Sequence, residues 1–336
     1  MKKKALFIFP LFFLPLCAHA SSFDTCIMQL VENGPDELTL GMMKARCTVE
    51  VEKPGTRQPK VAQLSSPLTP VARRLETDRS NILKPFTLMA HNPNYILPFA
   101  HNFVGWGSEP YTNTNGEEHL DLEDTEIQLQ LSIKTPLAVD LFSTGVNAWG
   151  GYTIRSFWQG YNSNNSSPFR ETNHEPEIWL QHSSNLHFGP LRNVGNSIGL
   201  VHQSNGQGGN LSRSWNYAYV TFGFELADFV FMVKPWYRFQ ENAEDDNNAT
   251  ITDYLGHGEL TAAWKYGDNV FSLISRNNLE SGFSRGSVQF GWSFPLFNYH
   301  YIKGYVQYFS GYGESLIDYD HYVNRLGVGF LLTDFL

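Results

Sequence analysis

Short segments in which apolar and polar residues alternate recur along most of this 336-residue chain. In the clearest, residues 125–134, Ile127, Leu129 and Leu131 alternate with polar side chains. A period of two places the two kinds of residue on opposite faces of a β-strand. Similar segments lie at about 95–104, 146–160, 175–183, 194–204, 213–226, 229–240, 252–265, 269–276, 286–295, 299–309 and 321–333. The sequence therefore predicts twelve strands.

Hydropathy and aromatic content indicate which kind of β protein these strands form. No run after the amino-terminal segment reaches the ~18–20 apolar residues of a membrane helix, and the mean hydropathy is −0.30. Aromatic residues make up 15% of the chain, more than a soluble core of this size needs. Aromatic girdles and alternating segments of about ten residues are typical of outer-membrane barrels. We expect an all-β fold, a twelve-stranded antiparallel transmembrane β-barrel.

The faces of the predicted strands are consistent with closure into a barrel. Their apolar sides would meet lipid and their polar sides the interior. In a barrel of this size polar side chains fill the interior in place of an open pore. The polar side chains expected to fill the interior include Glu225, Lys234, Arg238 and Gln289. A soluble β-sandwich shows the same alternation with its apolar side in the core, and is the alternative fold.

The amino terminus predicts export. Lysines at positions 2 to 4 precede an apolar run and an Ala-x-Ala site, the pattern of a cleavable signal peptide over residues 1–20. Cys17 admits a lipoprotein as an alternative, but Leu16 is bulky where a lipidation signal has a small residue. The mature chain is expected to begin at Ser21.

Residues 21–85 differ from the rest of the chain, with a helix-compatible segment near 37–46 followed by several prolines. We interpret them as a short periplasmic extension and linker before a barrel domain over residues 86–336. Cys26 and Cys47 are an even pair in an oxidising compartment, so a disulfide is favoured over a metal site or a nucleophile. The net charge of −9 and the pI near 5.6 argue against nucleic acid as a partner.

Two predicted strands carry side chains of catalytic type on their apolar faces. His202 and Ser204 share a face with Ile198 and Leu200, and Asn216 shares one with apolar residues of the next strand. A hairpin register that pairs His202 with Asn216 places their Cβ atoms about 5 Å apart. A serine needs a base to take its proton, and an asparagine carbonyl can accept the imidazole N–H without a charge that would be costly to desolvate.

Strand counting places these residues at one end of the barrel. If the first strand rises from the periplasm, odd-numbered strands end outside, and His202, Ser204 and Asn216 lie on the outer rim. The loops that contain Ser166 and Asp246 fall at the same end. The H-x-S-x-G string alone is a weak signal, and the alternative is a polar rim at the membrane interface.

Five blocks of sequence give this pattern a family resemblance. They occur in the order SSPFRETNHEP at 166–176, HQSNG at 202–206, SRSWN at 212–216, KPWY at 234–237 and SGYGESLIDY at 310–319. Over residues 85–336 the chain resembles the outer membrane phospholipase A family of Gram-negative bacteria. The resemblance implies a homodimeric barrel that uses calcium to hydrolyse acyl esters of phospholipids at sn-1 and sn-2, and of lysophospholipids, with its active site facing the outer leaflet.

The resemblance also implies roles for individual residues. Ser204 would be the nucleophile, His202 the general base and Asn216 the residue that orients the imidazole. Calcium would be held by oxygen ligands, as a hard cation prefers. The implied ligands are the Gln207 main-chain carbonyl, the Ser212 hydroxyl and the partner subunit's Ser166, with Asp246 contributing to a further calcium position.

Three positions depart from the family pattern. Gln207 stands where many relatives have arginine, which a main-chain ligand tolerates. Gly209 stands where relatives can have aspartate, so a weaker calcium site of the monomer is expected to be altered. Ile154 replaces a membrane-embedded glutamine, and the hydrogen bond lost from the dimer is worth on the order of 1 kcal/mol.

Other polar residues are expected to have structural roles. Arg170, Arg213 and Lys234 are interpreted as rim or interior ion partners, and the sequence predicts that His174 is a surface or lumen residue. The Gly- and Tyr-rich segment 311–322 could order an outer loop near the headgroups. Two other functions stay open at this stage: a non-catalytic structural or porin-like barrel, and a soluble exported esterase.

Overall fold

The computed structural model describes residues 69–84, 86–107, 111, 121–242, 244, 246–297 and 299–336, without the side chains of 165 and 300. The expected signal peptide, the segment near 37–46 and the cysteines Cys17, Cys26 and Cys47 lie outside the described residues. Residues 67–336 form one compact unit.

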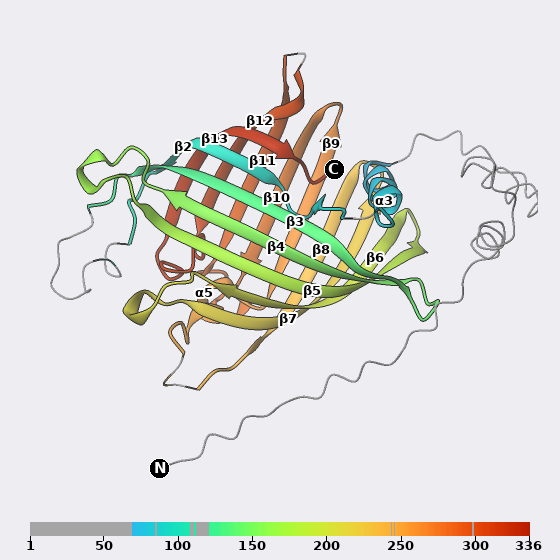
Figure 1. Ribbon diagram of the computed structural model, residues 1–336, viewed down its shortest axis with the longest axis horizontal. Coiled ribbons are helices and arrows are strands. Elements are labelled where there is room, and N and C mark those ends of the chain that lie inside the picture. The colour runs from blue at the N-terminus through green and yellow to red at the C-terminus, as the bar shows by residue number, and fades with distance from the viewer. Residues whose placement is uncertain are drawn as a thin grey trace, which may run out of the picture. The chain divides into compact units, whose positions relative to one another are not determined.

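One antiparallel sheet closes on itself to form a barrel (Figure 1). β2 pairs with β13 on one side and β3 on the other, and β3 pairs with β4. A two-residue strand, β1 (Met89–Ala90), pairs with the far part of β3. The other twelve strands are β2 (Asn94–Asn102), β3 (Thr125–Leu141), β4 (Val146–Trp158), β5 (Phe169–Phe188), β6 (Leu191–Ser204), β7 (Ser214–Leu226), β8 (Phe229–Phe239), β9 (Gly258–Tyr266), β10 (Asn269–Asn277), β11 (Gly286–Leu296), β12 (Tyr299–Gly311) and β13 (Val323–Thr333). The predicted twelve-stranded antiparallel barrel is confirmed.

Several of the predicted strands have other boundaries in the structure. The segment expected to be a strand over 252–265 begins as a helix, α5 (Ile251–Leu255), and is extended only from Gly258. Ile251 and Leu255 are buried four residues apart, which is helical spacing that five residues cannot distinguish from alternation. The strand expected over 175–183 is longer, because the polar residues before it continue the pairing of β5 with β4.

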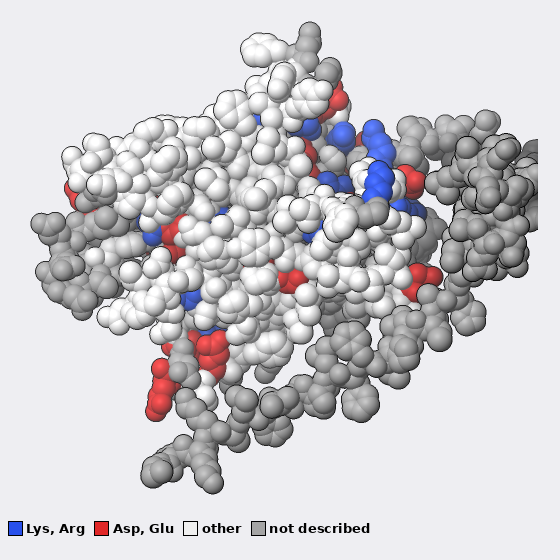
Figure 2. Space-filling model, viewed as in Figure 1, with Lys and Arg blue, Asp and Glu red and all other residues white. Residues whose placement is uncertain are grey.

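The two faces of the wall differ as the alternation predicts. Ile178, Leu200 and Phe222 are 54%, 49% and 41% exposed, and much of the wall in Figure 2 carries no charged residue. Glu225 and Arg238 are buried, while Lys234 and Gln289 line an interior cavity of about 140 Å³. The interior is therefore filled by side chains.

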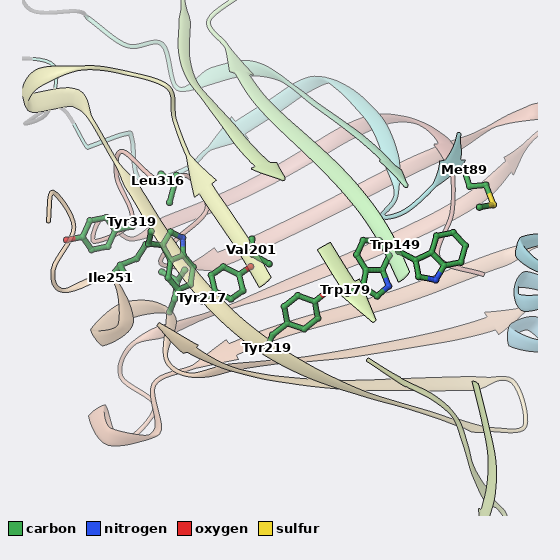
Figure 3. Packing of buried hydrophobic residues seen from close by; sticks show 11 residues of the cluster. Met89, Trp149, Trp179, Val201, Tyr217, Tyr219, Ile251, Leu316 and Tyr319 are labelled. Carbon is green, nitrogen blue, oxygen red and sulfur yellow. The ribbon is translucent and has the colours of Figure 1, made fainter. Parts of the chain in front are cut away.

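Inward-facing aromatic residues form the largest apolar cluster of this interior (Figure 3). Trp149, Trp179, Tyr217 and Tyr219 come from the barrel wall. Leu316 and Tyr319 of the loop after β12, together with Ile251 of α5, complete the cluster at its other end. Residues 314–319 of the segment 311–322, which was expected to order an outer loop, are buried inside the barrel mouth.

A buried ion network holds that loop in place. Arg170 Nε lies 2.9 Å from Glu126 Oε2, and its Nη1 lies 2.9 Å from Asp318 Oδ2. None of the three side chains is more than 1% exposed. The guanidinium also stacks 4.0 Å from the centroid of Trp106. This confirms Arg170 as an interior ion partner and ties the loop after β12 to β3 and β5.

A second buried pair lies beside it. Arg325 Nε donates to Glu314 Oε1 at 2.5 Å, and its Nη2 donates to Gln307 Oε1. Burial raises the pKa of the Glu314 carboxyl, although Arg325 opposes that shift. The loop therefore has two anchoring arginines, one on β5 and one on β13.

The opposite end of the barrel, where the short turns lie, contacts helix α3 (Pro70–Asn81). The Thr69 hydroxyl donates to Glu225 Oε2 at 2.9 Å and also caps the helix. Lys134 Nζ lies 2.6 Å from Asp78 Oδ2. No helix in the described part of the chain is long and apolar enough to cross a membrane.

Arg170→Ala should destabilise the barrel strongly. Removal of one partner leaves two buried carboxylates without a countercharge, a cost of about 3–5 kcal/mol. The free energy of unfolding of detergent-refolded protein in urea measures it. Arg285→Ala is the matched control, since that arginine is 41% exposed and 3.9 Å from Asp253, and its loss should cost about 1 kcal/mol or less. Equal losses in the two variants would contradict a structural role for the network.

Candidate active site

The hairpin of β6 and β7 places the candidate catalytic residues on the outer wall. His202 pairs with Asn216, and Ser204 pairs with Ser214. Paired residues of adjacent strands share a face, and Leu200, two residues before His202, is 49% exposed. The face expected from the alternation is confirmed, and the register is the one that brings His202 opposite Asn216.

His202 and Asn216 are hydrogen bonded. The distance from His202 Nδ1 to Asn216 Oδ1 is 2.9 Å. Since an amide oxygen can only accept, Nδ1 carries the proton in this arrangement and Nε2 holds the lone pair. Ser204 lies two residues from His202 on the same face of β6. The arrangement is suited to removal of a serine proton by Nε2.

A shallow groove of about 570 Å³ surrounds this pair on the outside of the barrel. Ile178, Leu200 and Phe239 give it an apolar lining, and His202 and Asn216 lie in it. The groove thus combines apolar surface with a few polar groups, which is the usual composition of a site for an amphipathic ligand.

Asn205 organises the loop that follows β6, a role that the sequence did not suggest. Its Oδ1 accepts from the main-chain N–H groups of Gln207 and Arg213, at 3.2 and 3.0 Å. Its Nδ2 donates to the Leu211 carbonyl at 2.8 Å and to Glu171 Oε2 at 3.4 Å. Asn205 is 3% exposed, so the loop is closed from within.

The expected calcium ligands lie in three different loops. Gln207 and Ser212 lie together in the loop closed by Asn205, and no hydrogen bond among the described residues uses the Gln207 carbonyl or the Ser212 hydroxyl. Ser166 is exposed in the loop between β4 and β5, with a φ of 59°. Asp246 lies in the loop after β8, where its Oδ1 is 2.7 Å from Arg238 Nη2.

The chemistry of this donor set fits calcium. Carbonyl and hydroxyl oxygens are ligands that calcium accepts, and two of them are left available in one ordered loop. No group of three or more His, Cys, Asp or Glu that could hold a metal occurs among the described residues. A cation bound by the Gln207 carbonyl and the Ser212 hydroxyl would be held by neutral oxygens.

Three further residues adjoin the site without a sequence signal of their own. Glu241 Oε1 accepts a hydrogen bond from Asn216 Nδ2 at 3.1 Å. His174 pairs with Ser204 across β5 and β6, and its Nδ1 lies 2.6 Å from the hydroxyl of Tyr152. His174 is thus at the site, on the outer face. Only the positions of neighbouring strands could have indicated these contacts.

The other residues interpreted as ion partners differ in their roles. Arg213 donates to the carbonyls of Asn210 and Ser212, at 2.9 and 2.8 Å, and so helps to shape the loop. Lys234 lies in the interior, 4.2 Å from the centroid of the Tyr219 ring.

Ile154, which stands where relatives have a membrane-embedded glutamine, pairs with Leu131 and His174 on the outer wall.

A closed barrel with an apolar outer wall and a filled polar interior is an outer-membrane barrel. The family model described as phospholipase A1 matches residues 71–332. The chain therefore belongs to the phospholipase A1 family.

Individual relatives agree with this assignment. A protein of Neisseria meningitidis serogroup B is 35% identical over 303 residues, which cover 87% of this chain and 78% of that protein. The solved outer membrane phospholipase of Salmonella typhi, a dimer with bound calcium, is 33% identical, with a TM-score of 0.70 over 76% of this chain and 97% of that one. A solved asparagine-to-alanine active-site mutant of outer membrane phospholipase A from Escherichia coli has the same identity, TM-score and coverage.

Asn205→Ala should loosen the loop between β6 and β7 while the barrel stays folded. It removes the buried amide that closes the loop, and the local opening equilibrium should rise about tenfold or more. Trypsin cleavage after Arg213, followed by mass spectrometry, measures it. Asn210→Ala is the matched control, since that side chain is exposed in the same loop. Equal cleavage rates in the two variants would show that Asn205 does not close the loop.

Proposed function

We propose that this outer-membrane phospholipase hydrolyses the acyl esters of phospholipids at sn-1 and sn-2, and of lysophospholipids, with Ser204 as nucleophile, His202 as general base and Asn216 as its orienting partner. The observation that carries the proposal is the 2.9 Å hydrogen bond from His202 to Asn216 on the outer wall beside Ser204. The active-site mutation of an asparagine in the Escherichia coli relative supports the role of Asn216.

The reaction follows from these positions. As Ser204 Oγ bonds to the ester carbonyl carbon, His202 Nε2 takes the hydroxyl proton. The imidazolium then gives that proton to the departing glycerol oxygen, and a water molecule activated by the same base hydrolyses the acyl-enzyme. Asn216 accepts the Nδ1–H of His202 throughout, so the ring keeps one orientation.

The outward position of the site determines how substrate reaches it. A phospholipid in the adjacent leaflet can enter the groove laterally, with an acyl chain against Ile178 and Leu200 and its ester near Ser204. The site lies at the end of the barrel with the long loops, which we assign to the outer leaflet. Substrate would then be present only when phospholipid reaches that leaflet.

Calcium and a second copy of the chain complete the proposed site. The Gln207 carbonyl and the Ser212 hydroxyl would hold the cation, together with Ser166 of the partner subunit, and Asp246 would contribute to a further calcium position in the outer loops. When bound, calcium would polarise the ester carbonyl and stabilise the negative charge that develops on its oxygen. The dimer with bound calcium solved for the Salmonella typhi relative supports this part of the proposal.

Ser204→Ala should abolish acyl release from phospholipid micelles. Loss of the nucleophile should lower kcat by about a thousandfold or more, with the barrel still folded by its heat-modifiable mobility on gels. The matched control is Ser310→Ala, a serine on β12 that donates to or accepts from Tyr322 at 2.8 Å, away from β6. If the folded wild-type protein released no acyl chains, the catalytic proposal would be refuted and a non-catalytic structural role would remain.

Calcium removal should stop the reaction, and the ligand set can be tested by the calcium titration. EDTA should abolish acyl release, and excess calcium should restore it. Ser212→Ala removes a side-chain ligand and should raise the calcium concentration for half-maximal activity about tenfold, equivalent to ~1.4 kcal/mol. Gln207→Ala keeps the main-chain carbonyl and should shift that concentration by less than about twofold, within the ~0.5 kcal/mol expected of a surface change. A large shift in Gln207→Ala alone would contradict main-chain ligation.

A further inference from the structure

Glu241 lies just beyond β8, where its carboxylate reaches back to the candidate triad. β8 pairs Phe239 with Asn216, and Glu241 follows two residues later. Its Oε1 accepts the hydrogen bond from Asn216 Nδ2 at 3.1 Å. The side chain is half-buried and lines the groove. None of the salt bridges among the described residues involves Glu241.

This contact removes an ambiguity that every asparagine has. The two ends of a side-chain amide have nearly the same shape, but one accepts hydrogen bonds and the other donates them. If Nδ2 faced His202, it would donate to Nδ1 and the imidazole proton would move to Nε2. That tautomer cannot take a proton from Ser204, so the amide orientation decides whether the base works.

A carboxylate settles the orientation because it can only accept. With Glu241 on one side, Asn216 gains a charge-assisted hydrogen bond when Nδ2 faces the carboxylate. Oδ1 then faces His202, which must carry its proton on Nδ1. Each group in the series Glu241, Asn216 and His202 thus fixes the hydrogen-bonding role of the next.

We propose that Glu241 is a positioning residue that sets the amide orientation of Asn216 and, through it, the tautomer of His202. The inference rests on the proposed function of the triad. The carboxylate also supplies the negative charge that Asn216 lacks, so it favours the imidazolium formed during attack. Glu241 acts on Ser204 through these two residues.

The kinetic test compares Glu241→Ala, Glu241→Gln and the control Glu244→Ala. Glu244 is exposed in the same loop, so its replacement removes the same charge. Glu241→Ala should lower kcat about tenfold, the effect of one hydrogen bond to a charged group, with KM changed by less than about twofold. The kcat of Glu241→Gln should lie between those of Glu241→Ala and the wild type, since the glutamine amide oxygen can still accept a hydrogen bond. Similar losses in both alanine variants would overturn the proposal.

A double-mutant cycle shows whether Glu241 acts through Asn216. In an Asn216→Ala background, Glu241→Ala should cause little further loss, because residues in one hydrogen-bonded series are not additive. An undiminished tenfold loss in that background would mean that Glu241 acts by another route and would overturn the proposal.

The tautomer itself can be read without activity. In protein labelled with ¹⁵N-histidine, His202 should give the shifts of an Nδ1–H imidazole, and Glu241→Ala should move them toward a mixture of tautomers. His202→Asn identifies the signal. A tautomer unchanged in Glu241→Ala would overturn the inference. Absence of hydrolysis by the wild-type protein would refute the proposed function and leave this measurement valid.

Discussion

The constraint on which this structure depends is that a chain in hydrocarbon must pair all of its backbone polar groups within itself. The chain meets it by pairing β2 with β13, which joins its first and last long strands and gives each strand of the barrel two neighbours. Closure fixes the direction of every side chain, because successive residues must face lipid and lumen in turn. A polar residue on the lipid-facing side is then expensive, so the presence of His202 and Asn216 there needs a functional explanation.

Polar side chains in the barrel interior hold the loop of the outer site in place. Arg170, on β5, joins β3 to the loop after β12 through two buried carboxylates. The next residue, Glu171, accepts from Asn173 at 2.6 Å and lies 3.4 Å from the Asn205 amide that closes the loop between β6 and β7. The loop with the proposed calcium ligands is therefore anchored to the lumen and not only to the strands that it joins. Rigid support of this kind is what a site that must hold its groups within a fraction of an ångström requires.

The features that could be predicted from the sequence are those encoded by local periodicity. Alternation gave the strand number and the common face of His202 and Asn216, because a slip by one residue would turn the side chains of the slipped strand to the wrong face. Helix α5 could not be predicted, since Ile251 and Leu255 satisfy either period over so short a segment. Contacts between distant segments could not be predicted from local periodicity either, because residues such as Arg170 and Asp318 are 148 positions apart in the sequence. Asn205 and Glu241 belong to the same class, because their importance comes from what other strands place beside them.

The cost of desolvating polar groups on the lipid-facing wall also explains why an amide, Asn216, stands between His202 and the carboxylate of Glu241. A carboxylate bonded directly to His202 would lie on the lipid-facing wall, where removal of its hydration is costly unless the charge is fully paired. The neutral amide of Asn216 spans the distance, and the charge lies on Glu241, two residues beyond the end of β8 and near the rim. The wall then carries a base with a defined tautomer, while the group that defines it keeps part of its hydration. In this arrangement the strand register sets the position of His202 along the barrel wall, and Glu241 in the loop after β8 sets its tautomer.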